Sequence, residues 1–227
     1  LIFLGIFNAS VPFLLFSYSA LSINAGTMSV LNGTSPLFAF IISIVWLKLA
    51  FNWTQLVGIL IGITGLLIFV GFESLEFSTF PLFLCLLGAF LYAFCSNYIY
   101  KLEHLDPTYV ACMTLLIGTI LFSPIVIIDE TFSLNQTPRV LWSIFLLGFL
   151  CTGLAYIGFV ILLKRIGPVR ASTVLLIVPL SGMLWAYIFL GERITLSMLI
   201  GCLLILGGVG LTNFKRKEES PEKRAVI

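Results

Sequence analysis

Charged residues are segregated along this sequence, and their absence from seven long intervals constrains the fold more than any other feature. Most of these intervals match the roughly 20 residues that one helix needs to cross a hydrocarbon core of about 30 Å. The first interval is longer and would form a single helix of about 70 Å, so we expect it to turn back at the polar residues 22–27. The intervals without Asp, Glu, Lys or Arg are 1–47, 49–72, 77–100, 107–128, 140–163, 171–191 and 194–214.

The composition excludes an ordinary soluble domain. Apolar residues make up 60% of the chain, charged residues make up 10%, and the mean hydropathy is +1.15, whereas a soluble domain is about 25% charged. The strands of a membrane β-barrel would alternate polar and apolar residues, and these runs of Leu, Ile, Phe and Val do not. We therefore predict an all-α polytopic membrane protein. Its eight transmembrane helices are predicted at about 1–21, 27–47, 53–71, 79–100, 107–128, 138–163, 168–190 and 195–214.

A shift of 143 positions aligns the end of the sequence with its beginning without a gap. The alignment matches Gly and Pro residues, whose special backbone properties make chance coincidence less frequent than for Leu or Ile. The helix at 1–21 falls on the helix at 138–163, which follows five membrane crossings later, so the second copy is inverted. Inverted repeats are the basis of many secondary transporters. The matched pairs include Gly5 with Gly148, Phe16 with Phe159, Ser29 with Ser172, Pro36 with Pro179, Leu47 with Leu190, Gly58 with Gly201 and Gly65 with Gly208.

The basic residues predict an orientation in the membrane. With the C-terminus inside, ten of the 12 Lys and Arg residues lie in inner segments, and only Arg139 and Arg193 lie in outer ones. This bias follows the positive-inside rule. We therefore expect a multi-pass protein, with its C-terminus cytoplasmic, in the plasma (inner) membrane. The loops expected outside are 22–26, 72–78, 129–137 and 191–194, and those expected inside are 48–52, 101–106, 164–167 and the tail.

Three features of the second copy carry a resemblance to a known family. They are Pro179, the sequence Leu190-Gly191-Glu192 and the spacing from Gly201 to Gly208. With them in place, residues 1–214 resemble the EamA family of the drug/metabolite transporter superfamily. The resemblance implies ten helices in two inverted five-helix repeats, with both termini cytoplasmic. It supports the fold strongly and identifies the substrate hardly at all.

The sequence departs from that family pattern in two ways. The first copy has Trp46-Leu47-Lys48 where the second has the Gly-Glu corner, so that motif is carried over only to Gly191 and Glu192. The first copy also has three predicted helices where the second has five. We therefore expect residues 1–71 to be the last three helices of the first repeat, with two more helices upstream. Residues 79–214 are then the second, inverted repeat, and 215–227 a disordered cytoplasmic tail.

Glu192 and Arg193 form a charged corner between two apolar runs. Gly191 can end one helix in a left-handed conformation, and Thr195 can cap the next. Glu192 then lies near the positive end of that second helix. This favours an outer-surface corner, with an outer gate or coupling carboxylate as the alternative for Glu192.

Uncharged polar residues on the predicted helices are the candidates for a substrate cavity. An Asn amide facing lipid would be costly, and helices equivalent to 1–21, 27–47, 79–100, 138–163 and 168–190 surround the central pathway in the family that the chain resembles. The alternative for each residue is a hydrogen bond between helices. Pro36 and Pro179 are expected to kink their helices and free a carbonyl near Asn32 and Leu175, for substrate or simply at a bend. The candidate cavity-lining residues are Asn8, Asn32, Ser35, Tyr92, Thr152 and Tyr156.

No pattern of catalytic or metal-binding residues is present in the sequence. The five cysteines are scattered in apolar runs without a C-x-x-C pair, which is typical of small apolar fillers. The single histidine, His104, lies in a short loop rich in charged residues. G-x-S-x-G and H-E-x-x-H motifs are absent. We therefore expect no enzyme activity, no cofactor, no bound metal and no nucleic-acid partner.

The sequence thus predicts a secondary transporter that exports or exchanges a small metabolite by alternating access. An amino acid or an amphipathic compound is the expected substrate, and a proton or a counter-substrate the expected coupling partner. A non-transporting membrane scaffold or chaperone of the same fold is one alternative, and a membrane-embedded enzyme is the other. The sequence leaves the oligomeric state open.

Overall fold

The computed structural model describes residues 1–71, 79–102, 104–128, 137–190 and 194–213. Every regular element in this part of the chain is a helix, and eight segments are long and apolar enough to cross a membrane. The predicted all-α polytopic fold is confirmed. The corner at 191–193 and the tail at 214–227, for which roles were predicted, lie outside the described residues.

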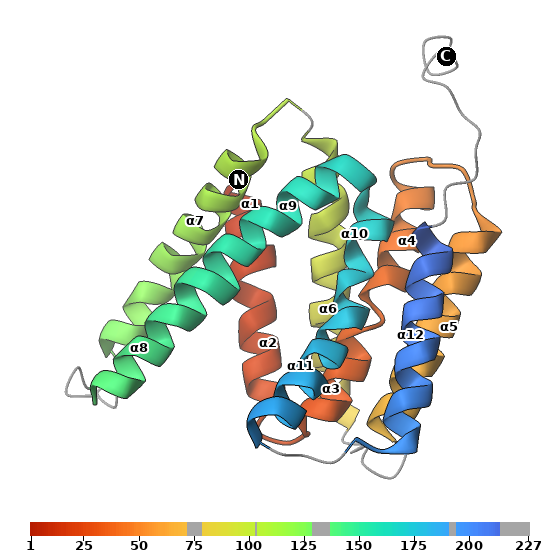
Figure 1. Ribbon diagram of the computed structural model, residues 1–227. Helices are drawn as coiled ribbons and strands as arrows, with labels where there is room; N and C mark the ends of the chain where they lie inside the picture. The colour runs from red at the N-terminus through yellow and green to blue at the C-terminus, as the bar shows by residue number, and fades with distance from the viewer. Residues whose placement is uncertain (72–78, 103, 129–136, 191–193, 214–227) are drawn as a thin grey trace.

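The eight segments, called spans one to eight, agree closely with the predicted helices, although four of them are divided into shorter elements (Figure 1). Span one comprises α1 (Ile2–Leu4), the π-helix η1 (Gly5–Ser10) and α2 (Val11–Ser19), and span two comprises α3 (Ala25–Asn32) and α4 (Ser35–Val45). Spans three, four and five are the single helices α5 (Trp53–Val70), α6 (Thr79–Lys101) and α7 (Pro107–Ile128). Span six comprises α8 (Pro138–Leu146), the π-helix η3 (Leu147–Leu154) and α9 (Ala155–Ile166), span seven comprises α10 (Pro168–Ser172) and α11 (Val174–Leu190), and span eight is α12 (Leu196–Asn213).

Side-chain caps start several of these helices where the sequence predicts them. Asn52 Oδ1 accepts a hydrogen bond from Thr54 N at 2.9 Å, and Thr195 Oγ1 accepts one from Met198 N at 3.3 Å. These two residues are matched by the repeat, so spans three and eight begin in the same way. Such caps satisfy backbone N–H groups that have no partner within the helix.

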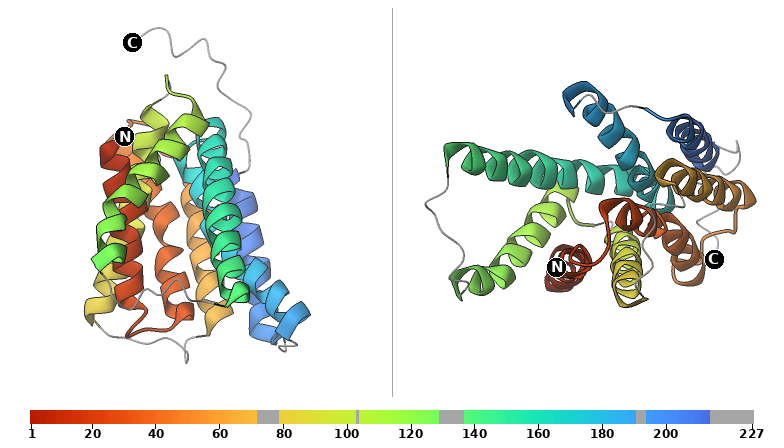
Figure 2. Two further views of the ribbon diagram at one scale, coloured as in Figure 1. Left: turned by 90° about the vertical axis from the view of Figure 1, so that its left-hand side faces the viewer. Right: turned by 90° about the horizontal axis from the view of Figure 1, so that it is seen from below.

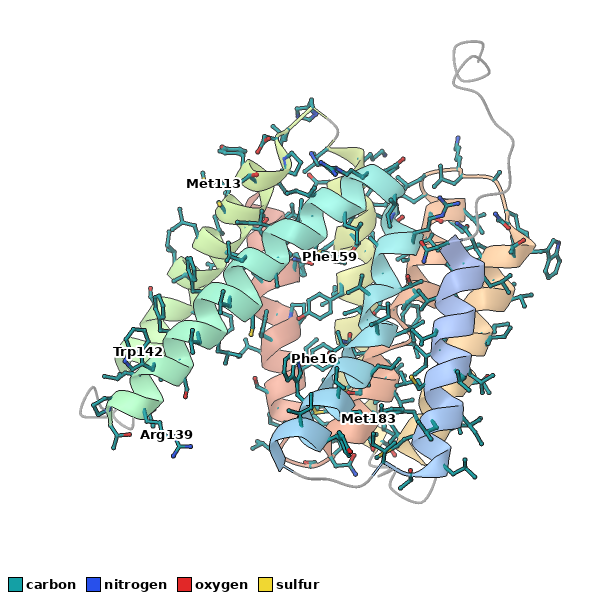
Figure 3. All side chains as sticks on the ribbon, in the orientation of Figure 1. Phe16, Met113, Arg139, Trp142, Phe159 and Met183 are labelled. Carbon is teal, nitrogen blue, oxygen red and sulfur yellow. The ribbon has the colours of Figure 1, made fainter. Side chains whose placement is uncertain are left out.

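The basic residues gather at one end of the bundle. The C-terminal ends of α4, α6, α9 and α12 lie together at the top of Figure 1, where Lys48, Lys101, Lys164 and Arg165 follow or end the helices. Arg139 lies at the opposite end, at the start of α8 (Figure 3). The helices therefore alternate in direction as predicted, and one end of the bundle carries more basic residues than the other.

The contact between α5 and α12 shows the relation between the two repeats directly. A Cβ built on Gly208 would lie 2.5 Å from the carbonyl oxygen of Gly58, and one built on Gly65 would lie 2.9 Å from that of Gly201. The shift of 143 turns the first of these contacts into the second, because Gly58 matches Gly201 and Gly65 matches Gly208. When matched residues of two helices exchange roles in this way across their contact, the two helices are related by a two-fold axis. It supports an inverted repeat from geometry alone.

The matched spans one and six have different surroundings. Gly5 of span one lies against α7, where an added Cβ would collide with the side chain of Ile117. Gly148, its match in span six, has nothing within 4 Å of an added Cβ. None of the residues in α8 and η3 is buried, and Figure 2 shows this segment extending away from the other helices. The N-terminal half of span six therefore has a face that the described residues leave uncovered.

Spans two and seven are each interrupted between two shorter helices. Span two breaks at Gly33 and Thr34, two residues before Pro36, and span seven breaks at Thr173. Pro179 lies within α11, which continues through it. Broken helices are typical of transporters, because their interrupted backbone can line a cavity.

Candidate functional site

A hydrogen bond joins span one to span six in the interior of the bundle. The Asn8 side-chain amide donates to the Tyr156 hydroxyl at a distance of 2.6 Å. Asn8 lies within η1 and is 7% exposed, and Tyr156 lies in the first turn of α9, directly after η3. Both were predicted as cavity-lining residues, and the structure brings them into contact.

Further polar and aromatic groups surround this pair. The Thr114 hydroxyl of α7 lies near Tyr156 and bonds to Val110 O at 2.7 Å. Tyr92, another predicted residue, lies in the neighbourhood of Tyr156 and stacks on Phe16 with ring centroids 5.8 Å apart. Phe16 points from α2 towards the centre of the bundle (Figure 3). We call Asn8, Tyr92, Thr114 and Tyr156 the central polar cluster.

The central polar cluster is uncharged. Its members are one amide, two phenols and one aliphatic hydroxyl, and the predicted membrane spans that supply them have no Asp, Glu, Lys or Arg at this depth. Amides and hydroxyls both donate and accept hydrogen bonds. The cluster can therefore bind a neutral or zwitterionic group, and it has no built-in preference for one sign of charge.

A second polar group lies at the break in span two. The Ser35 hydroxyl is buried and lies 3.4 Å from Asn32 Oδ1, a long hydrogen bond. Asn32 ends α3 and Ser35 begins α4, so both side chains lie beside interrupted backbone. The structure places this pair on a different helix from the central polar cluster and shows no hydrogen bond between the two groups among the described residues.

Thr152 is the remaining cavity candidate and lies in η3, four residues before Tyr156. Its hydroxyl bonds to Leu147 O, five residues earlier, at 3.1 Å. Ser10 makes a similar bond in η1, to Gly5 O, five residues earlier, at 2.9 Å. Thr152 therefore contacts backbone within its own helix, and its predicted role in the cavity stays a prediction.

The rest of the predicted site falls outside these groups. Glu192, the expected outer gate or coupling residue, lies outside the described residues. Within the described chain, no three His, Cys, Asp or Glu side chains gather where they could hold a metal ion. A hollow of about 350 Å³ occurs on α8, but Pro138, Leu141, Trp142 and Phe145 line it, and it belongs to the uncovered face of span six.

Two features of the site were not predicted from the sequence. Thr114 was missed because α7 was not among the helices expected at the pathway. The π-helical turns at η1 and η3 have no local sequence pattern of their own. The only signal for them is the match of Gly5 with Gly148, which places both turns at one position of the repeat.

Comparison with known proteins connects this arrangement to transport. The sequence profile of the EamA-like transporter family matches residues 1–71 and 79–214. The chain is 30% identical over 203 residues to the uncharacterized transporter YoaV of Bacillus subtilis (strain 168), an alignment that covers 87% of this chain and 70% of YoaV. It is 27% identical over 214 residues to an uncharacterized transporter of Archaeoglobus fulgidus, covering 94% of this chain and 76% of that protein. A crystal structure of a protein with 17% sequence identity superposes with a TM-score of 0.80, over 92% of this chain and 74% of that chain, and supports the fold.

Proposed function

The chain belongs to the EamA-like transporter family, and from this premise we propose that it is a secondary transporter that exports or exchanges a small metabolite by alternating access. The observation that carries the proposal is the hydrogen bond between Asn8 and Tyr156. It places paired polar groups from the two inverted repeats inside an apolar bundle, and binding sites of inverted-repeat transporters lie at the interface between repeats.

The chemistry of the central polar cluster indicates the class of substrate. Its hydroxyl and amide groups fit a solute with several hydrogen-bonding atoms, and the stacked rings of Phe16 and Tyr92 offer an apolar wall beside them. A small amphipathic metabolite has both properties, and a zwitterionic amino acid is the simplest example. We propose this class, with efflux from the cell as the direction. A proton or a counter-substrate supplies the driving force.

The division of the chain into repeats is part of the proposal. Residues 79–214 are the second repeat, residues 1–71 hold the last three helices of the first, and residues 215–227 are a cytoplasmic tail. Two further helices, equivalent to α6 and α7, cover the uncovered face of span six and pack against Gly148, as α7 packs against Gly5. The end that carries Lys48, Lys101 and Lys164 faces the cytoplasm, since basic residues remain on the inner side of the plasma membrane.

A counterflow assay in proteoliposomes tests the proposal. Vesicles preloaded with unlabelled L-alanine, L-threonine or L-tryptophan are expected to accumulate the corresponding labelled amino acid, and an Asn8→Ala variant is expected to accumulate less per folded molecule. Protein-free vesicles give the background. Flux at the background level for amino acids and for a wider panel of amphipathic metabolites would support the scaffold alternative instead, and chemical conversion of a solute would support an enzyme.

A further inference from the structure

Two π-helical turns occupy matched positions in the two repeats. The shift of 143 carries Gly5–Ser10, the whole of η1, onto residues 148–153, which lie inside η3. A π-helix makes hydrogen bonds between residues five apart. Such turns are rare in proteins overall, but those that occur are often found at functional sites. Their occurrence at one repeat position in both spans therefore calls for a common cause.

Each π-helical turn carries a side-chain bond of the same kind, although the two hydroxyls lie one position apart in the repeat alignment, where Thr152 falls on Ala9. The Ser10 hydroxyl donates to Gly5 O and the Thr152 hydroxyl to Leu147 O, both five residues back. Most other Ser and Thr side chains of the spans bond three or four residues back, as Thr119 does to Leu115 O in α7. A hydroxyl that reaches the fifth residue reinforces the π-helical turn, because its bond spans the same interval as the backbone bond.

The turns also determine which side chains face each other. A π-helical turn accommodates one extra residue. That residue rotates the helical segment after the turn by about 100° relative to the segment before it. In span one, Phe3 before the turn and Phe16 after it both contact α6, through Phe94 and Tyr92 respectively. Thirteen residues of regular α-helix would leave these two rings about 140° apart around the helix axis, and the extra residue places Phe16 about 120° from Phe3 on the other side of the axis. Asn8 lies within this rotated segment.

We infer that Ser10 and Thr152 are positioning residues that hold the paired π-helical turns, so that Asn8 and Tyr156 meet across the interface between repeats. The inference rests on the proposed function, because it concerns the same central polar cluster. Ser10 acts through Asn8, which lies within η1, and Thr152 acts through Tyr156, which follows η3 directly. Neither hydroxyl is required to touch the substrate.

The test is a double-mutant cycle on thermal unfolding in detergent, which needs no substrate. In the parent protein, Asn8→Ala and Tyr156→Phe are expected to be coupled, so that the double variant loses about 2–4 °C less in apparent Tm than the sum of the single losses. In a Ser10→Ala background this coupling is expected to vanish, and Ser10→Thr is expected to restore it. Thr119→Ala, which removes a hydroxyl-to-backbone bond from a regular helix, is the matched control and is expected to leave the coupling intact.

A merely structural role predicts a different pattern. Ser10→Ala would then lower Tm but preserve the coupling between Asn8 and Tyr156, and that result overturns the inference. If Ser10→Ala does not fold, Thr152→Ala and Thr152→Ser provide the same comparison from span six. The measurement is independent of transport, so a protein that moves no amino acid in vesicles contradicts the proposed function alone.

Discussion

The Asn8 amide and the Tyr156 hydroxyl lie 2.6 Å apart although 148 residues separate them in the sequence. The bond crosses from the first repeat to the second, and each partner lies in or beside a π-helical turn. A solute with a hydrogen-bonding group can replace either partner of this bond. The pair is therefore well placed to exchange an internal contact for one with substrate.

Removal of either partner is expected to weaken substrate binding more than folding. Asn8→Ala and Tyr156→Phe should each raise the apparent KM of amino-acid counterflow about twofold to tenfold, because one lost hydrogen bond costs about 0.5–1.5 kcal/mol. Tyr109→Phe, at an exposed tyrosine of α7, is the control and should leave KM unchanged. Unaltered KM in both variants, together with a lower Tm, would assign the pair to helix packing.

Asn32→Leu is expected to reduce transport with little loss of folded protein. The Asn32 side chain accepts a long hydrogen bond of 3.4 Å from the Ser35 hydroxyl, so replacing the amide is expected to cost little stability. The residue ends α3 at the break in span two, where a polar side chain can reach a cavity. Counterflow per folded molecule, with the folded fraction measured by size-exclusion chromatography, separates the two effects. A loss of folded protein with normal specific activity contradicts a role in binding.

Gly208→Ala is expected to destabilise the bundle by about 1–3 kcal/mol or more, as overpacking does in other proteins. The new Cβ would lie 2.5 Å from Gly58 O and 2.6 Å from Gly62 N, and backbone atoms cannot move aside as a side chain can. Gly210→Ala on the same helix is the control, because nothing lies within 4 Å of its Cβ. Alanine there should be neutral or slightly stabilising. Equal unfolding midpoints for the two variants would mean that α5 and α12 are not in this close contact.

The orientation can be measured by labelling single cysteines in a background that lacks the five native ones. His104→Cys lies at the end of the bundle with the basic residues and is expected to react with a membrane-impermeant maleimide only after permeabilisation. Arg139→Cys lies at the opposite end and is expected to react in intact cells. The reverse pattern would place the C-terminus outside.

Gly148→Ala tests the proposed upstream helices. In the 227-residue chain the substitution should be tolerated, because nothing lies within 4 Å of the added Cβ. In a longer protein that includes two preceding helices, it should lower stability, as Gly5→Ala is expected to do against Ile117 here. Gly158→Ala, at another open glycine, controls for helix propensity. Tolerance of Gly148→Ala in the longer protein contradicts the proposed packing.

The number and limits of the membrane spans could be predicted from the sequence because the cost of burying charge in lipid fixes where charges can lie. The capping roles of Asn52 and Thr195 could also be predicted, since a cap depends only on nearby residues. The repeat predicted that Gly58 and Gly65 match Gly201 and Gly208. It did not show that the two pairs cross at one interface, because contact between distant helices depends on the whole bundle.

The candidate site was predictable only in part. Asn8 and Tyr156 were recognised because polar residues are conspicuous in apolar helices, but their pairing depends on the π-helical turns. Those turns leave no trace in hydrophobic periodicity. Thr114 was missed for a related reason: a threonine can satisfy its own hydroxyl within a helix, as it does here with Val110 O, and so gives no sign of a partner elsewhere.

The crossed glycines of α5 and α12 also limit how the bundle can change shape. With carbonyl oxygens and α-carbons of the two helices this close, a slide of one turn would bring a larger side chain such as Leu204 against backbone. Rotation about the contact avoids that collision, because the closest points stay where they are. The close contact therefore makes rotation, and not sliding, the expected relative movement of α5 and α12.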